Sequence, residues 1–313
     1  MKGEFEFIEG IRTMFPSPEG VRGIGDDCAI IPQVQGQDTL VSTDMLVEGS
    51  HFLMEDISPY QLGWKSAASN FSDIAAMGGE PVGSFLAVAL PKNLPEAWLD
   101  EFLKGYRDIS NEYSFPLLGG DTTSSPDRLC ICVTVLGKAL EGRSVTRSGA
   151  QAGDLVCVTG TLGDSAAGLQ AILKEVPRTE EVPYLIDRHY LPTPRVREGR
   201  ILAADMGVHS MMDISDGVGS DLRHILEESR VGAEIDIRTI PLSRQLRTFC
   251  QRHGLDPVEL ALCGGEDYEL LFTVAPEAEP SLAVDHTVIG RIVEGCSVRW
   301  TGSDKDYMGF RHF

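Results

Sequence analysis

The sequence predicts two α/β (α+β) domains. The chain has 313 residues, and a typical length of about 150 residues per domain makes two domains the expectation. Segments with strand and helix patterns alternate in both halves of the chain, which is typical of mixed α/β folds. Between the halves lies a polar, glycine-containing segment, EGRSVTRSGAQAGD, at residues 141–154. We therefore expect one domain at residues 1–140 and a second at residues 150–313.

Capping residues and hydrophobic periodicity predict the elements of the first half. Ser58 is expected to cap a helix that begins at Pro59 and continues to Met77, where two glycines end it. A second long helix is expected over residues 95–113, because apolar residues recur there at helical spacing. The other expected elements are a helix over residues 4–14 and strands over residues 29–31, 39–43, 84–90 and 129–136.

The same alternation begins again after the polar segment. Short β-branched and apolar runs predict strands, and the longer segments between them predict helices. The prolines within residues 182–197 suggest a linker. The expected strands cover residues 155–159, 210–214, 233–237 and 268–274, and the expected helices cover residues 165–174, 197–205 and 220–229.

Composition excludes several classes of function. The net charge is 27 − 47 = −20, which argues against nonspecific binding of nucleic acid or of anionic membranes. The expected helices lack the roughly 20 consecutive apolar residues that span a bilayer, and the acidic start, MKGEFEFIEG, is unlike a signal peptide. Seven cysteines without a CxxC pair suit reduced thiols. We therefore expect a cytoplasmic protein.

The aspartates recur beside Gly, Ser or Thr, and Asp44, Asp121 and Asp213 are expected where strands end. Turn and cap chemistry explains any one such segment alone. Together, carboxylates at strand ends would converge where ligands bind α/β sheets, and divalent cations would be needed to offset their repulsion. Oxygen ligands without His or Cys favour Mg²⁺. The segments are GDD at 25–27, STD at 42–44, SD at 72–73, GGDTT at 119–123, DISDG at 213–217 and GGED at 264–267.

The same segments are compatible with phosphate binding. Glycines beside the carboxylates let main-chain N–H groups approach phosphate oxygens, and no Walker A motif is present. A nucleotide would therefore be held by carboxylate-bound metal and glycine-rich loops. Arg147 could grip a phosphate or lie solvated at the surface. His51 could contact a ligand, although its spacing alone slightly favours a structural role.

These segments, taken in order, resemble thiamine-monophosphate kinase. The matching segments span nearly the whole chain and are GIGDDCA, STDMLVEGSHF, SNFSDIAAMGGEP, GGDTT, TRSGAQAGD, VTGTLGDSAAGL, MDISDG, GGEDYELLFT and the terminal GFRHF. The resemblance implies Mg²⁺-dependent transfer of the γ-phosphoryl group of ATP to thiamine monophosphate, giving thiamine diphosphate. It also implies a two-domain fold like that of aminoimidazole ribonucleotide synthetase, with the N-terminal sheet as the core of a homodimer.

The resemblance also implies roles for individual residues. The implied magnesium ligands are Asp27, Ser42, Thr43, Asp44, Asp73, Asp121, Asp213 and Asp216, and the implied ATP contacts are Gly120, Asp121, Arg147 and Ser215. The implied contacts with thiamine monophosphate are His51, Glu266 and Phe310. We assign no catalytic base, because a phosphate monoester with a second pKa of about 6 is already mostly dianionic at neutral pH.

Two alternatives remain at this point. The first is another ATP-using member of the same superfamily, such as aminoimidazole ribonucleotide synthetase, selenophosphate synthetase or the hydrogenase-maturation dehydratase. Selenophosphate synthetase would need a reactive cysteine or selenocysteine in an N-terminal glycine-rich loop, and none precedes Cys28. The hydrogenase-maturation dehydratase would need a C-terminal cysteine, whereas this chain ends in Phe313. The second alternative is a non-catalytic acidic protein that binds divalent cations, although the chain has no EF-hand pattern.

Overall fold

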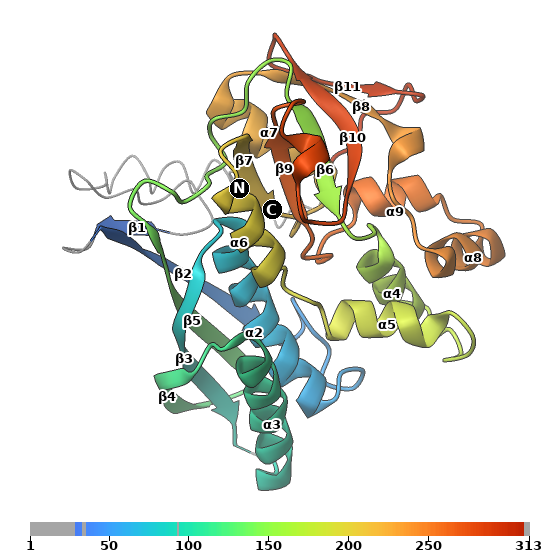
Figure 1. Ribbon diagram of the computed structural model, residues 1–313. Coiled ribbons are helices and arrows are strands. Elements are labelled where there is room, and N and C mark those ends of the chain that lie inside the picture. The colour runs from blue at the N-terminus through green and yellow to red at the C-terminus, as the bar shows by residue number, and fades with distance from the viewer. Residues whose placement is uncertain (1–28, 33–35, 93, 310–313) are drawn as a thin grey trace.

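Two β-sheets, formed by the two halves of the chain, organise the computed structural model, which describes residues 29–32, 36–92 and 94–309 (Figure 1). The first sheet has five strands in the order β1-β2-β5-β3-β4. Only the β3–β4 pair is parallel. The strands are β1 (Ala29–Pro32), β2 (Gln37–Val47), β3 (Glu80–Pro91), β4 (Leu117–Ser125) and β5 (Cys130–Leu140).

The second sheet has six strands in the order β11-β8-β10-β6-β9-β7. All of its strand pairs are antiparallel except β11 with β8. The central strands β6 and β9 are almost entirely buried because helices or loops cover both faces. The strands are β6 (Leu155–Thr159), β7 (Val208–Asp213), β8 (Gly232–Asp236), β9 (Leu270–Val274), β10 (His286–Val293) and β11 (Val298–Thr301).

The helices lie beside and between the sheets (Figure 1). In the described residues they are α2 (Pro59–Ala76), α3 (Glu96–Tyr113), α4 (Asp164–Leu173), α5 (Val182–Tyr190), α6 (Val196–Ala204), α7 (Val218–Ser229), α8 (Arg244–His253) and α9 (Pro257–Cys263). As the sequence predicts, Ser58 caps α2, and its hydroxyl accepts a hydrogen bond from the Gln61 N–H group. Two short 3₁₀ turns, Ile237–Thr239 and Glu279–Ser281, complete the helical structure.

Helix α2 is the central element of the molecule. It packs on β2 and β5 of the first sheet, and also on α5, α6 and β7 from the second half. Small residues permit this close packing: a Cβ atom on Gly63 would lie 2.0 Å from the Phe102 carbonyl oxygen of α3. Near its end, Ala76 joins the core formed by Leu202 and Phe272. Because α2 contacts both sheets, its polar side chains can bond to residues of the first sheet and of the second.

Some expectations from the sequence are wrong. The expected linker contains helix α5, because Pro183 lies in its first turn, where a missing N–H group costs nothing. Strands β2 and β4 continue past Asp44 and Asp121, so these residues lie within strands rather than at their ends. Asp213 does end β7, as expected. The expected helix over residues 4–14 lies outside the described residues.

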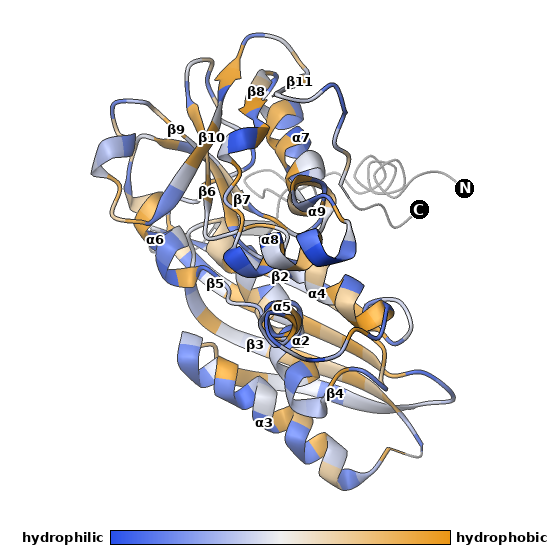
Figure 2. Cartoon of the chain, turned by 90° about the vertical axis from the view of Figure 1, so that its right-hand side faces the viewer, coloured by the Kyte–Doolittle hydropathy of each residue, from blue (hydrophilic) through white to orange (hydrophobic). Residues whose placement is uncertain are grey.

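Helices α2 and α3 cover one face of the first sheet, and in the described ranges no helix covers the other (Figures 1 and 2). Large apolar side chains remain exposed on its strands: Met45 on β2, Phe85 on β3, Leu118 on β4 and Leu140 on β5. An apolar surface of this kind marks an interaction site more often than free surface. Within the described residues, no helix has the length and apolar character needed to cross a membrane.

Candidate functional site

The first part of the candidate site is formed where α2 packs on β2. The Ser42 hydroxyl of β2 donates a hydrogen bond to the Asp73 carboxylate of α2, at 2.5 Å. One turn earlier in the helix, the Asn70 side-chain oxygen accepts a hydrogen bond from the main-chain N–H of Asp44, at 3.1 Å. Ser42 and Asp44 point to the same side of β2 because side chains alternate along a strand. These contacts hold Asp44 and Asp73 at the packed face of the first sheet.

The second half of the chain brings Asp213 to the same place. Asp213 is almost fully buried, and its carboxylate accepts a 2.6 Å hydrogen bond from the hydroxyl of Ser72, the residue before Asp73. The buried Tyr268 phenol lies within the field of these groups. The pKa of Tyr268 is raised well above its usual value, first by burial and then by the negative charges of Glu266, Asp44, Asp213 and Asp73. Carboxylates from both halves of the chain therefore converge.

The loop after β7 adds Ser215 and Asp216. Their main-chain N–H groups both donate to one oxygen of Asp221, at 3.1 and 3.2 Å. Burial raises the pKa of Asp221 well above its usual value, and the charges of Asp216 and Asp213 raise it further. The charge of Arg147 acts in the opposite direction. Arg147, Ser215 and Asp216 therefore all lie close to Asp221.

The GGED loop after α9 contributes Glu266. Its carboxylate accepts a 2.9 Å hydrogen bond from the ammonium group of Lys65, which is buried in α2. Burial alone would raise the pKa of Glu266, but the charge of Lys65 and its hydrogen bond, together with electrostatic interactions with the His189 and His51 side chains, outweigh burial and lower it. His51 itself is held in a tight turn, where its Nδ1 accepts from the Val47 N–H group at 3.0 Å. The two predicted substrate contacts, His51 and Glu266, are therefore close enough to interact.

Other predicted site residues are not brought to this cluster within one chain. The Thr43 side chain points to the opposite face of β2, where its hydroxyl contacts the Val133 carbonyl oxygen and Thr134. The strand register aligns Asp44 with Val133, Leu86 and Gly120. Three strand spacings therefore separate Asp44 from Gly120 and its neighbour Asp121, which is roughly 14 Å. Asp27 and Phe310 lie outside the described residues.

Several residues of the site were missed by sequence reasoning. Lys65, Ser72 and Asn70 all lie on α2 and hold predicted site residues by hydrogen bonds. A signal was present for Lys65, because a lysine within the small-residue run LGWKSAAS is buried if the helix packs on all sides. Tyr268 and Asp221 gave no comparable signal, since their surroundings come from segments far apart in the sequence.

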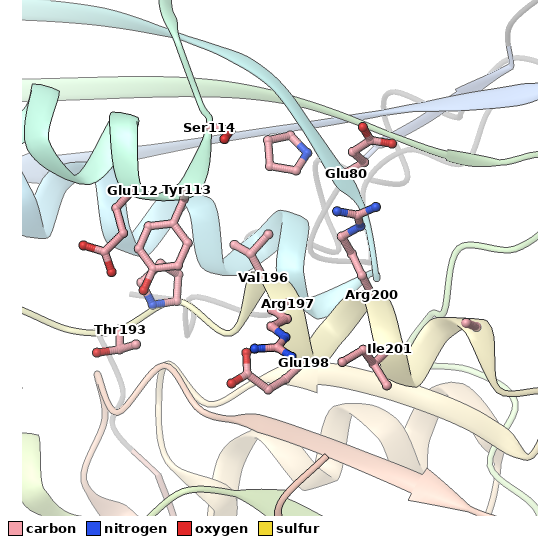
Figure 3. Close-up of a pocket in the computed structure, with 13 residues that line it drawn as sticks. Glu80, Glu112, Tyr113, Ser114, Thr193, Val196, Arg197, Glu198, Arg200 and Ile201 are labelled. Carbon is pink, nitrogen blue, oxygen red and sulfur yellow. The ribbon is translucent and has the colours of Figure 1, made fainter. Parts of the chain in front are cut away.

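A pocket of about 880 Å³ lies elsewhere, where α3, α6 and the start of β3 meet (Figure 3). It is lined by charged and apolar side chains, among them Glu80, Tyr113, Arg197, Arg200 and Ile201. None of the predicted site residues lines it, so it is separate from the carboxylate cluster. In the part of the chain that the structure describes, no three His, Cys, Asp or Glu side chains are grouped closely enough to hold a metal ion.

Comparison with known proteins agrees with this architecture. The family profile "AIR synthase related protein, N-terminal domain" matches residues 25–139, and that for the C-terminal domain matches residues 151–301. Thiamine-monophosphate kinase from Escherichia coli (strain K12) is 44% identical over 93% of this chain and 91% of its own length. The enzyme of that name from Aquifex aeolicus is 37% identical over 99% and 98%, respectively.

A solved structure confirms the predicted two-domain fold. The structure described as "AaThiL complexed with AMPPCP and TMP" superposes with a TM-score of 0.92 and 37% identity, covering 99% of this chain and 97% of that one. The similarity thus extends through both sheets and the α2 helix between them. With the sequence matches over nearly the full length, it confirms the resemblance carried by the motifs. The chain belongs to the thiamine-monophosphate kinase family.

Proposed function

We propose that this protein transfers the γ-phosphoryl group of ATP to thiamine monophosphate and so forms thiamine diphosphate. The observation that carries the proposal is the convergence of Asp44 and Asp73 from the first half with Asp213 from the second. Relatives named thiamine-monophosphate kinase, 37–44% identical to the chain, support this substrate over those of other superfamily members.

The donor set of the cluster suits Mg²⁺. Near Asp44, Asp73 and Asp213 the predicted ligands are carboxylate and hydroxyl oxygens, and Mg²⁺ usually takes one or two carboxylates together with waters and substrate phosphates. The charges that raise the pKa of Tyr268 show a concentration of negative potential that a cation would offset. We propose Asp27, Ser42, Asp44, Asp73, Asp213 and Asp216 as ligands, with Thr43 acting through its main-chain oxygen. When bound, several Mg²⁺ ions, each held by one or two of these carboxylates, would neutralise phosphate charge.

The protein's own residues would act by positioning. The acceptor phosphate is mostly dianionic at neutral pH and needs no general base. Arg147 and Ser215 are proposed to hold ATP, and His51, Glu266 and Phe310 to hold thiamine monophosphate. Because both ligands are anionic and the protein is acidic, holding them in line against their mutual repulsion is the main contribution to the rate.

The direct test is ADP release coupled to a spectrophotometric assay. Purified protein with ATP, Mg²⁺ and thiamine monophosphate is expected to release ADP and form thiamine diphosphate in equal amounts. EDTA should abolish turnover, and excess Mg²⁺ should restore it, because the carboxylates would otherwise repel the nucleotide phosphates. Full turnover without a divalent cation would rule out the metal-assisted mechanism. ATP binding without turnover on any superfamily substrate would favour the non-catalytic alternative.

We also propose a homodimer in which a second copy completes the site. The apolar face of the first sheet that no helix of the described residues covers, with Met45, Phe85, Leu118 and Leu140 exposed, supports an interface there. Within one chain, Asp44 and Asp121 are separated by roughly 14 Å. This separation supports a site in which the second copy of the chain contributes Gly120 and Asp121. These two residues would then contact the ATP and metal of the neighbouring site.

Mixing two inactive variants tests the shared site. If Asp73→Asn and Asp121→Asn chains are unfolded, mixed and refolded together, half of the dimers are mixed. Each mixed dimer has one site in which both aspartates are intact. Activity should therefore recover to about a quarter of the wild-type value. A mixture as inactive as its components would place both aspartates in a site formed by one chain.

A further inference from the structure

A buried lysine from the first half of the chain, Lys65, forms an ion pair with Glu266 from the second half, whose carboxylate is proposed to contact the substrate. The Lys65 side chain is 1% exposed, whereas that of Glu266 is 30% exposed. The Lys65 ammonium group donates to Glu266 Oε2 at 2.9 Å and to the His189 carbonyl oxygen at 3.2 Å. Its third contact is His189 Nε2, at 3.4 Å. All three N–H donors of the ammonium group therefore have an acceptor.

The loop that carries Glu266 leaves its main chain little freedom. Glu266 has a positive φ of 63°, and its N–H group donates to the Ser215 carbonyl oxygen at 2.8 Å. A Cβ atom on the preceding Gly265 would lie 2.3 Å from the same oxygen, so only glycine fits there. The position of the Glu266 Cα atom is thus fixed by the loop. The direction of its carboxylate is fixed by Lys65.

The contacts also assign the proton on His189. A lysine ammonium group only donates, so Nε2 of His189 must be the acceptor and the ring proton must lie on Nδ1. Nδ1 lies 3.0 Å from the Ser165 hydroxyl and 3.3 Å from Glu266 Oε2. Burial and then the charge of Lys65 lower the pKa of His189 to about 3, so the ring is neutral at physiological pH. Lys65 is therefore the cation that balances Glu266.

The two oxygens of Glu266 are in different situations. Oε2 contacts both Lys65 and His189, whereas the described residues make no hydrogen bond to Oε1. Lys65 also neutralises the net charge of the carboxylate. The Glu266 carboxylate would then recognise a substrate through Oε1 as a directional hydrogen-bond acceptor, not as an unpaired negative charge.

We propose that Lys65 is a positioning residue for substrate binding: it fixes Glu266 through Oε2, so that Oε1 accepts a hydrogen bond from an N–H donor of the substrate. The inference rests on the proposed function, because it takes Glu266 as a contact of thiamine monophosphate. It adds that the recognised group is an N–H donor. It also adds that Lys65 sets the affinity for the acceptor substrate. Lys65 lies on α2, the same helix as the proposed metal ligand Asp73.

The test compares Lys65→Met, Lys65→Arg and wild type, with Lys104→Met as the control. Lys104 is an exposed lysine of α3 that also pairs with a glutamate, and its replacement should change nothing. Lys65→Met should raise KM for thiamine monophosphate about tenfold, the usual effect of losing one charged hydrogen bond, and leave KM for ATP unchanged. Lys65→Arg should recover part of the affinity.

A pH profile gives a readout that a purely structural role would not move. Without Lys65, burial raises the pKa of Glu266, so its carboxylate is protonated at higher pH. The fall of kcat/KM for thiamine monophosphate on the acidic side should therefore shift to higher pH in Lys65→Met. It should stay near the wild-type position in Lys65→Arg. Unchanged profiles and unchanged KM values in a folded Lys65→Met protein would overturn the proposal.

The double variant Lys65→Met/Glu266→Gln keeps the proposal testable if Lys65→Met does not fold, because it leaves no buried charge without a partner. If Lys65 acts through Glu266, the double variant should have the same KM as Glu266→Gln alone, within about twofold. Additive effects would show that Lys65 acts independently. Wild-type protein that fails to bind thiamine monophosphate by calorimetry would instead reject the proposed function itself, and this inference with it.

Discussion

Replacement of Asp73 by asparagine is expected to lower kcat by about two to three orders of magnitude, the usual effect of removing one electrostatic group from a phosphoryl-transfer site. The Asp73 carboxylate accepts a hydrogen bond from Ser42 of β2, and Ser72, its neighbour in α2, donates to Asp213 of the second half. An asparagine keeps the size and one oxygen of the side chain but removes the negative charge. The measurement is steady-state kinetics at saturating ATP and thiamine monophosphate.

The fold of the Asp73 variant should be intact, since the amide can still accept the Ser42 hydrogen bond. Circular dichroism and thermal unfolding check this point. Asp100→Asn, on the exposed side of α3, is the matched control and should keep wild-type turnover. A folded Asp73→Asn protein with nearly normal kcat would remove Asp73 from the proposed metal ligands.

Replacement of Glu269 by glutamine is expected to lower the free energy of unfolding by about 3–5 kcal/mol, the range for breaking a buried ion pair from one side. The Glu269 side chain is 0% exposed. It accepts hydrogen bonds from Arg188 at 2.9 Å, from Arg195 at 2.6 Å through two nitrogens, and from the Thr159 hydroxyl at 2.7 Å. The variant removes the carboxylate shared by two partly buried guanidinium groups and leaves Arg195 with its longer, 3.5 Å pair to Glu198. Chemical denaturation measures the loss.

Glu234 provides a matched control for this effect. It also pairs with two arginines, Arg291 and Arg299, but at the surface of the second sheet. Solvent screens such pairs, so Glu234→Gln should leave the free energy of unfolding nearly unchanged. If the two glutamine variants lost the same free energy of unfolding, burial would not explain the contribution of the Glu269 ion pairs to stability.

Much of the fold was predictable from local signals. The cap at Ser58 and the glycines after Met77 gave both ends of α2, and β6 was predicted with its observed bounds. Helix α5 was missed because Pro183 was taken as a break, although proline is tolerated in a first turn. Helix α8 was also missed, although Ser243 caps it. Its burial depends on contacts with α4 and α5, which the sequence does not reveal.

The candidate site was predictable in its residue types but not in its arrangement. The repeated Asp-Gly and Asp-Ser segments predicted carboxylates from both halves at one site, and the structure places Asp44, Asp73 and Asp213 around Tyr268 but keeps Asp121 three strands away from Asp44 within one chain. The placement of Asp44 at a strand end was wrong, because β2 continues to Val47. Strand alternation then separates the Thr43 side chain from its neighbours Ser42 and Asp44. The role of Lys65 depends on a contact across 201 residues of sequence, which no local pattern contains.

The convergence of carboxylates from both halves on bound metal is tested most directly by anomalous diffraction from crystals containing Mn²⁺, a non-hydrolysable ATP analogue and thiamine monophosphate. Mn²⁺ replaces Mg²⁺ at oxygen-ligand sites. Anomalous peaks are expected within coordinating distance of Asp44 or Asp73 on one side and of Asp213 or Asp216 on the other. Peaks confined to one half of the chain, or at surface carboxylates only, would contradict the proposed site.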